Sequence, residues 1–258
     1  MLLLTKLKAK YITYCQFSTA VDRISALRLA FWDGLYDIRV RPKHASADVL
    51  IRGNSSDVDV FGQIFIQQEY GSLLGAKSVD LVIDAGANVG YSSVYFLTHF
   101  PDCHVIAIEP DPANFVALTQ NLAPYQSRVR LYNCGIWSKP AQLAIETSLY
   151  RDGREWTRQV RECAAGEKGD ITAITIGELL RQSGRERLSL LKMDIEGAEI
   201  VVFSHPEHQQ WLPRTDAMAI ELHDDTSFGQ ATELFHTVVR DQGFQISHSG
   251  ELTICRRG

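Results

Sequence analysis

The residues best suited to chemistry form a turn at positions 84–90, which read DAGANVG. An apolar stretch precedes Asp84 and a helix-like stretch follows Gly90. Gly86 would let a bound molecule approach the backbone closely, and Gly90 would let a helix pack tightly on a strand. Asn88 stands where dinucleotide-binding turns usually carry glycine, and asparagine is among the few residues that tolerate a positive φ. The turn therefore predicts a nucleotide-type cofactor site.

A second acid supports this prediction and indicates which cofactor binds. Glu109 lies 25 residues after Asp84, at the end of the next predicted strand. A carboxylate there can accept hydrogen bonds from both hydroxyls of a ribose. Asp84 lies where the phosphates of a dinucleotide would approach, so a cationic cofactor without phosphate fits better. We expect S-adenosylmethionine, with a nicotinamide-dependent dehydrogenase and a nucleotide-free α/β protein as the alternatives.

Further polar residues lie at or just after the ends of two predicted strands in the second half of the chain: Lys192, Asp194 and Glu196, then Glu221, His223, Asp224 and Asp225. Ligands of a doubly wound sheet bind at the carboxyl ends of its strands, so we expect these groups to converge. His223 or Asp194 would take the proton of an acceptor hydroxyl. Strand alternation places Lys192 on the same face as Asp194, and we count it as a third candidate catalytic residue. Alternatively, Asp194 and Glu196 only cap the helix that starts near Gly197, and His223 is an ordinary loop histidine.

A metal is a second chemical alternative at this edge. Asp194, Glu221 and His223 together could hold Mg²⁺ or Mn²⁺, which would acidify the acceptor hydroxyl.

Residues 147–170 show no periodicity and are rich in arginine and aromatic residues, which predicts a long loop. Trp156 could stack on a sugar face, and Arg154 could bind a carboxylate or phosphate. A nucleic-acid acceptor would use the same residue types. The net charge of −5 argues against nucleic acid, so we expect a small-molecule or glycan acceptor. The alternative is a solvated loop without a role in binding.

The elements that must position these residues alternate from residue 79 onward. The predicted strands are 79–84, 104–109, 129–133, 188–194, 216–222, 244–247 and 252–255. Strands separated by helices predict a mostly parallel α/β sheet covered on both faces. Asp111 followed by Pro112 marks the start of one helix. The last two strands are close enough to form a hairpin, so we predict the Rossmann-like seven-stranded methyltransferase sheet with one antiparallel edge.

Residues 1–72 predict an N-terminal α/β extension, and residues 73–258 the methyltransferase domain. The extension would contain a helix at about 20–35, strands at 37–42 and 48–53, and a helix at 55–70. Apolar residues recur at helical spacing in the first helix, and we expect this stripe to face the protein: Ile24, Leu27, Phe31 and Leu35.

Composition and cysteine content indicate the domain size and the cellular compartment of the protein. A chain of 258 residues with 45% hydrophobic and 22% charged residues suits one sizeable α/β domain with additions. Its five cysteines show no Cys-x-x-Cys spacing, which favours reduced thiols and a cytoplasmic protein. The apolar run Leu2–Leu4 is too short for a signal peptide or a transmembrane segment. Peripheral membrane contact through the basic start is the alternative.

Several of these segments together resemble the FkbM family of methyltransferases: 57–70, 84–93, 107–122, 190–199 and 220–224. The resemblance covers roughly residues 48–246. It implies an S-adenosylmethionine-dependent O-methyltransferase that acts on hydroxyls of sugars, glycolipids, oligosaccharides, polyketides or other natural products. It does not identify the acceptor, and a non-catalytic cofactor-binding module on the same fold is the alternative.

By match of position, the resemblance also implies the cofactor-binding residues: Asp84, Gly86, Asn88, Gly90 and Glu109, with Asn133 and Gly135 near the adenine.

Overall fold

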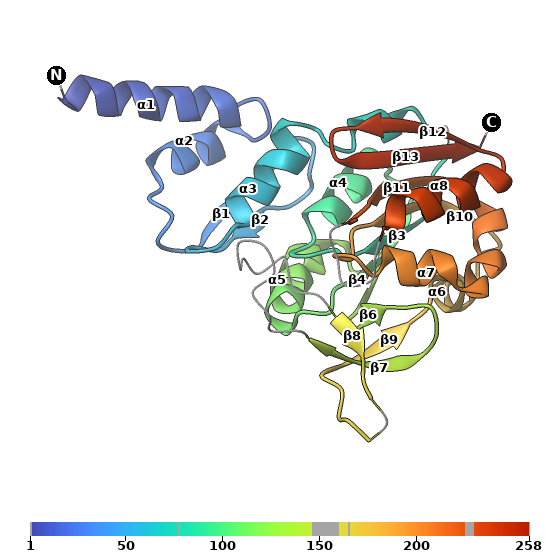
Figure 1. Ribbon diagram of the computed structural model, residues 1–258. Coiled ribbons are helices and arrows are strands. Elements are labelled where there is room, and N and C mark those ends of the chain that lie inside the picture. The colour runs from blue at the N-terminus through green and yellow to red at the C-terminus, as the bar shows by residue number, and fades with distance from the viewer. Residues whose placement is uncertain (1, 77, 146–159, 165, 225–229, 258) are drawn as a thin grey trace.

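The central sheet of the computed structural model has the seven predicted strands (Figure 1). The structure describes residues 2–76, 78–145, 160–164, 166–224 and 230–257. The strands are β3 (Leu81–Ala85), β4 (His104–Ile108), β5 (Val129–Tyr132), β10 (Leu188–Met193), β11 (Thr215–Glu221), β12 (Phe244–Ser249) and β13 (Leu252–Arg257). Their order is β12-β13-β11-β10-β3-β4-β5, and β13 is antiparallel to both neighbours. The predicted fold class and its antiparallel edge are confirmed.

Successive side chains of each strand point to opposite faces of the sheet, so the hydrophobic core has two layers, one on each face. Val82 packs into the cluster beneath α4 and α5, whereas Leu81 and Ile83 pack into the cluster beneath α6, α7 and α8. The helices are α4 (Tyr91–His99), α5 (Pro112–Leu122), α6 (Ile176–Ser183), α7 (Glu199–Ser204) and α8 (Ala231–Asp241), with short 3₁₀ turns at Gly71–Gly75, Ala123–Tyr125, Pro206–Gln210 and Leu212–Arg214. Helices cover both faces, so the carboxyl ends of the parallel strands are left to form the site.

A second sheet was not predicted. It contains β6 (Gly135–Ile136), β7 (Ala141–Ile145), β8 (Val160–Glu162) and β9 (Ile171–Ile174), in the order β6-β9-β7-β8. The prediction of one loop over residues 147–170 was therefore wrong at β8, while residues 146–159 lie outside the described residues. Strands of two to five residues are too short to show alternation, which is why the sequence did not reveal them.

The N-terminal residues form α1 (Leu2–Phe17), α2 (Arg23–Phe31), the antiparallel pair β1 (Ile38–Val40) and β2 (Val49–Ile51), α3 (Asp57–Phe61) and a π-helical turn, η1 (Gly62–Ile66). This segment shares a hydrophobic cluster with α4 and α5. Phe61 packs edge-on against Tyr91 of α4, with ring centroids 5.6 Å apart. The division of the chain at residues 72 and 73 stays a prediction.

The orientation predicted for the first of these helices was wrong. Ile24, Leu27, Phe31 and Leu35 are 51–66% exposed, and the buried face of α2 consists of Ser25, Ala26, Leu29 and Ala30. Both faces are largely apolar, so periodicity alone could not decide between them. Among the described residues no helix combines the length and the apolar character needed to span a membrane.

Candidate active site

The glycine-rich turn joins β3 to α4 at the carboxyl edge of the sheet. Its backbone has φ values of 76° at Gly86, 49° at Asn88 and 88° at Gly90, the positive values expected of these residues. Position 86 tolerates only glycine, because a Cβ there would overlap the backbone oxygen of Asp194 at the end of β10. The backbone of the turn therefore lies directly against the neighbouring strand end.

Asp84 lies beneath this turn. It is fully buried, and its Oδ2 accepts hydrogen bonds from the hydroxyls of Ser92 (2.7 Å) and Ser93 (2.6 Å). Its Oδ1 lies 3.5 Å from the Nζ of Lys192. Asp84 does not line either of the two pockets at this edge. Its contacts fit a residue that organises the turn, so direct contact with the cofactor stays a prediction.

Lys192 is buried beside Asp84, and its Nζ donates a hydrogen bond to the carbonyl oxygen of Gly86. Burial lowers the pKa of this amine, but the carboxylates of Asp84 and Asp194 outweigh burial and hold the pKa above its usual value. Lys192 is thus a fixed cation that supports the turn from below.

Glu109 connects the end of β4 to the turn. Its two carboxylate oxygens accept hydrogen bonds from the backbone N–H groups of Asn88 (2.8 Å) and Asp111 (2.9 Å). Burial raises the pKa of Glu109 to about 7. Each oxygen keeps a second lone pair, so the carboxylate remains able to accept hydrogen bonds from a ligand.

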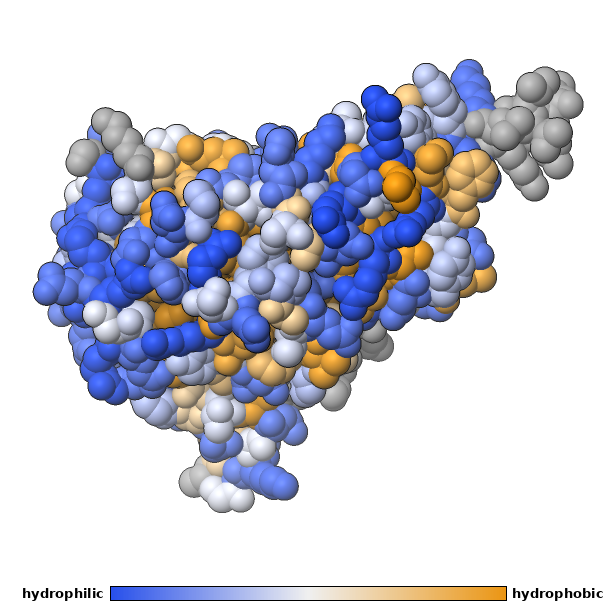
Figure 2. Space-filling view, turned by 180° about the vertical axis from the view of Figure 1, so that it is seen from behind, coloured by the Kyte–Doolittle hydropathy of each residue, from blue (hydrophilic) through white to orange (hydrophobic). Residues whose placement is uncertain are grey.

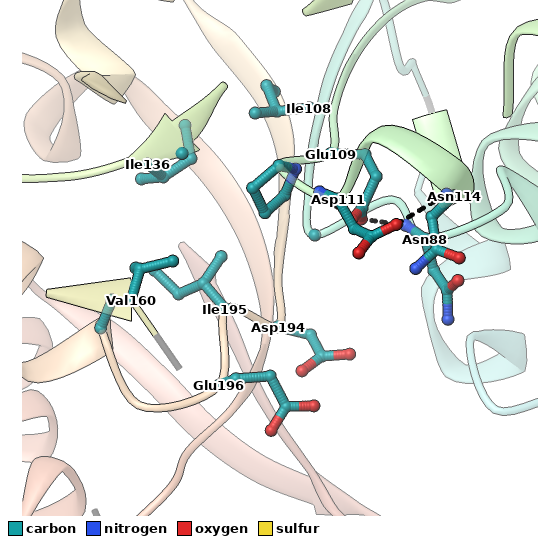
Figure 3. A pocket seen from close by; sticks show the side chains of 14 residues that line it. Asn88, Ile108, Glu109, Asp111, Asn114, Ile136, Val160, Asp194, Ile195 and Glu196 are labelled. Carbon is teal, nitrogen blue, oxygen red and sulfur yellow. Dashed lines mark hydrogen bonds between the residues drawn. The ribbon is translucent and has the colours of Figure 1, made fainter. Parts of the chain in front are cut away.

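Glu109 lines a pocket with an empty volume of about 770 Å³, here called the nonpolar pocket. Figure 3 shows Ile136, Val160 and Ile195 on one side of it and the Glu109 and Asp111 carboxylates on the other. Its apolar residues are Ile108, Pro110, Ile136, Val160, Ile195 and Ala198. Apolar walls facing a carboxylate suit a flat base joined to a ribose.

Four of the predicted cofactor residues line this pocket: Gly86, Asn88, Glu109 and Gly135. Gly90 and Asn133 do not. Asn133 is exposed, and its amide donates to the backbone oxygens of Glu109 (2.8 Å) and Pro110 (3.1 Å). It therefore supports the pocket wall from outside.

A second pocket, the acidic pocket, has an empty volume of about 1360 Å³ and adjoins the first. Both pockets share Gly86, Asn88, Asp194 and Glu196. The acidic pocket also contains Lys192, Glu221, His223 and four polar residues that the sequence analysis missed: Asp59, Gln63, Glu69 and Glu251. For Asp59, Gln63 and Glu69 the available signal was that polar residues interrupt the apolar pattern of the segment 57–70. Glu251 had no such signal.

His223 is surrounded by carboxylates. Its Nδ1 lies 3.2 Å from the Oε1 of Glu199, and its Nε2 lies 3.5 Å from Glu221 and 3.7 Å from Glu196. Burial lowers the pKa of the imidazole, but hydrogen bonds to Glu199 and Glu221 outweigh burial and raise it to about 11. His223 is therefore an imidazolium at neutral pH, which argues against its acting as a direct base.

Glu199, the fully buried partner of His223, was missed by sequence reasoning. Its Oε1 also accepts the N–H of Ile195 (3.0 Å), so it holds the loop after β10 as well as the imidazole. Its position inside the motif at 190–199 was the only signal.

Asp194 and Glu196 present carboxylates where the two pockets meet. Burial raises the pKa of Asp194 to about 6 and that of Glu196 to about 8. Glu196 has φ of 53°, which is uncommon for a residue other than glycine and often marks a functional position. One ligand atom each from Asp194, Glu196 and His223 lies within 4.8 Å of the others, a group that could hold a metal ion. The predicted metal ligands were Asp194, Glu221 and His223, and the group in the structure contains Glu196 instead of Glu221.

The predicted acceptor-binding residues Arg154 and Trp156 lie outside the described residues.

The strand order, the glycine turn and the acid after the next strand define a Rossmann-like methyltransferase fold. The chain belongs to the FkbM methyltransferase family, since residues 84–246 match the family described as "Methyltransferase FkbM domain". This confirms the resemblance inferred from the motifs, and the family implies S-adenosylmethionine as the methyl donor.

Individual relatives are distant. Methyltransferase sdnD of Sordaria araneosa is 25% identical over 220 residues, which cover 73% of this chain and 82% of sdnD. The 31-O-demethyl-FK506 methyltransferase FkbM of Streptomyces tacrolimicus is 24% identical over 195 residues, covering 65% of this chain and 73% of that protein. A solved FkbM methyltransferase of Methylobacillus flagellatus KT is 14% identical with a TM-score of 0.48; the match covers 98% of this chain and 59% of the solved chain.

Proposed function

We propose that the protein is an S-adenosylmethionine-dependent O-methyltransferase that acts on a hydroxyl of an uncharged sugar, glycan or natural-product acceptor. The observation that carries this proposal is the meeting of two unlike pockets at Gly86, Asp194 and Glu196. One pocket suits an adenosine, and the other suits a molecule rich in hydroxyl groups. The relative named for 31-O-demethyl-FK506 supports methylation on oxygen.

The residues of the nonpolar pocket fit the cofactor. Glu109 can accept ribose hydroxyls, and Ile108 and Ile136 offer apolar contact to a base. S-adenosylmethionine supplies a methyl group on a positively charged sulfur. The carboxylates of Asp194 and Glu196, at the junction of the pockets, favour a positive charge there.

The acidic pocket favours an uncharged acceptor. Acidic side chains outnumber basic ones among its lining residues, although burial raises the pKa of two of them, Glu69 to about 7 and Glu196 to about 8. The acidic residues are Asp59, Glu69, Asp194, Glu196, Glu221 and Glu251, and the basic ones are Lys192 and His223. A phosphate or carboxylate would be repelled, whereas hydroxyl groups can donate hydrogen bonds to carboxylates. This argues for a sugar or natural product over a nucleic acid.

The proton of the acceptor hydroxyl needs a base when the oxygen attacks the methyl carbon. A carboxylate oxygen of Asp194 is the candidate, because its pKa of about 6 leaves it ionised at neutral pH. His223 and Glu196, with pKa values of about 11 and about 8, hold their protons there. In this route the positive charge of the His223 imidazolium would favour the ionised form of Asp194.

In the alternative route, Asp194, Glu196 and His223 hold Mg²⁺ or Mn²⁺, which would acidify the hydroxyl.

The test is a screen of sugars, glycans and natural products with a labelled methyl donor, run with EDTA and with added Mg²⁺ or Mn²⁺. If a metal activates the hydroxyl, EDTA should abolish activity and added Mg²⁺ or Mn²⁺ should restore it. If a carboxylate is the base, neither EDTA nor the added ion should change activity. Both routes predict that Asp194→Asn and His223→Ala lower kcat at least tenfold, about 1.4 kcal/mol. The exposed His248→Ala is the matched control. Cofactor binding without turnover on any acceptor class would instead support a non-catalytic module.

A further inference from the structure

The two N-terminal helices and the loop after α2 carry most of the exposed large apolar side chains in the described part of the chain. Eight large hydrophobic residues are exposed in the described part of the chain, and seven of them lie between residues 11 and 36. These seven form the N-terminal apolar face: Tyr11, Ile12, Ile24, Leu27, Phe31, Leu35 and Tyr36. Only Val116, on α5, lies elsewhere. An apolar concentration of this kind is typical of a surface that binds something.

Basic residues border this face. Residues 1–40 contain six lysines and arginines and three aspartates, a net charge of +3, whereas the rest of the chain carries −8. Lys8, Lys10, Arg23 and Arg28 lie on the same two helices, and none of them pairs with a carboxylate among the described residues. The Nζ of Lys10 lies 4.1 Å from the ring centroid of Phe31, so the cations and the apolar side chains are directly adjacent.

The helices are placed to lie flat on a surface. In Figure 1, α1 and α2 lie side by side at one end of the molecule, beyond α3 and away from the seven-stranded sheet. In Figure 2, strongly hydrophilic and hydrophobic residues are interleaved over this end of the molecule. α1 has 16 residues and includes lysines, so contact along its length fits it better than insertion across a bilayer.

From these observations we propose that the N-terminal apolar face docks on a membrane surface that contains anionic lipids. Apolar side chains would enter the headgroup region while the bordering cations contact lipid phosphates, and the strength of such binding grows with the buried apolar area and with the attraction to anionic lipids. A symmetric dimer through the same face is disfavoured, because it would bring the basic helices of both copies together.

The experiment is sedimentation of the full chain with vesicles of phosphatidylcholine, alone or mixed with phosphatidylglycerol. We expect binding to the mixed vesicles and at least tenfold weaker binding to the neutral ones. Leu27→Ser with Phe31→Ser should weaken binding at least tenfold, and Val116→Ser should leave it within twofold. Lys8→Gln with Lys10→Gln should weaken it roughly 30-fold, and Lys168→Gln with Arg240→Gln should have little effect.

All substituted apolar residues are exposed, so the variants should keep the circular dichroism spectrum of the wild type. Equal binding of wild type and the Leu27/Phe31 variant, or no binding to either vesicle, would overturn the proposal. A dimer in light scattering that this variant dissociates would show that a second copy covers the face, and would also overturn it.

Discussion

Glu109 is the residue whose protonation most directly tests the cofactor site. Its pKa is raised from 4.5 to about 7 because it is buried, so the carboxylate ionises in the neutral range. An acid with a raised pKa makes folding less favourable as pH rises from about 4.5 to 7, because the folded state resists losing the proton. A ligand that donates hydrogen bonds to the ionised form would offset this cost.

We therefore expect affinity for S-adenosylmethionine to increase with pH. About a tenth of Glu109 is ionised one unit below its pKa and about nine tenths one unit above, so affinity should rise up to about ninefold from pH 6 to pH 8. Glu109→Gln should remove this dependence on pH. Titration calorimetry at both values is the measurement, and an equal pH dependence in the two proteins would exclude Glu109 from ribose binding.

The buried pair of Lys192 and Asp84 allows a prediction about stability. Lys192→Met would leave the Asp84 carboxylate without its neighbouring cation, and loss of one partner of a buried pair costs about 3–5 kcal/mol. Urea unfolding should show a loss of this size, and the exposed Lys168→Met should change stability by less than about 0.5 kcal/mol. Adding Asp84→Asn to Lys192→Met should recover part of the loss. A Lys192→Met protein as stable as wild type would contradict the pairing.

At the scale of elements, strands and helices with a long apolar pattern could be predicted, whereas very short strands could not. The inner strands β3, β4 and β10 each contribute a buried apolar run, and the cap formed by Asp111 and Pro112 marked the start of α5. The second sheet is built from strands too short to alternate visibly, such as β6 with two residues. In α2 the two faces differ too little in polarity for the sequence to indicate which one is buried.

The same distinction explains which residues of the site could be predicted from the sequence. The turn and Glu109 were predictable, because their roles follow from where each strand ends. Glu199 was not, since only tertiary packing brings it against His223, 24 residues later. The carboxyl groups of the acidic pocket come from α3, from the loop after η1, from the hairpin between β12 and β13 and from the sheet edge, so no local pattern could join them.

Substitution of Gly86 tests whether the turn and the end of β10 must approach each other as closely as the structure shows. Gly86→Ala combines a positive φ with an overlap of its Cβ and the Asp194 oxygen, whereas Gly184→Ala has a similar φ and open space around it. We expect Gly184→Ala to cost about 1 kcal/mol in unfolding free energy, and Gly86→Ala to cost at least twice as much. Gly86→Ala should also abolish measurable cofactor binding. Equal costs for both would show that β10 does not restrict position 86.

At the scale of the whole molecule, the N-terminal segment contributes to the site as well as to the core. Phe61 packs on Tyr91, and the hydroxyl of Tyr91 donates to the backbone of Leu50 (2.5 Å), which fixes the segment against α4. This packing brings Asp59, Gln63 and Glu69 to the wall of the acidic pocket. The segment should therefore influence which acceptor binds, whereas all residues that line the nonpolar pocket come from Gly86 onward.

Glu69 is the residue to test this division, because it lines the acidic pocket and not the nonpolar one. Glu69→Gln keeps the size of the side chain and removes a carboxylate that an acceptor hydroxyl could contact. Loss of one charge-assisted hydrogen bond, about 1.5 kcal/mol, should raise the acceptor KM about tenfold. Affinity for S-adenosylmethionine should stay within twofold, and the exposed Glu186→Gln should change neither quantity. If cofactor affinity falls and the acceptor KM does not, the N-terminal segment covers the cofactor, and the acceptor must enter from another side.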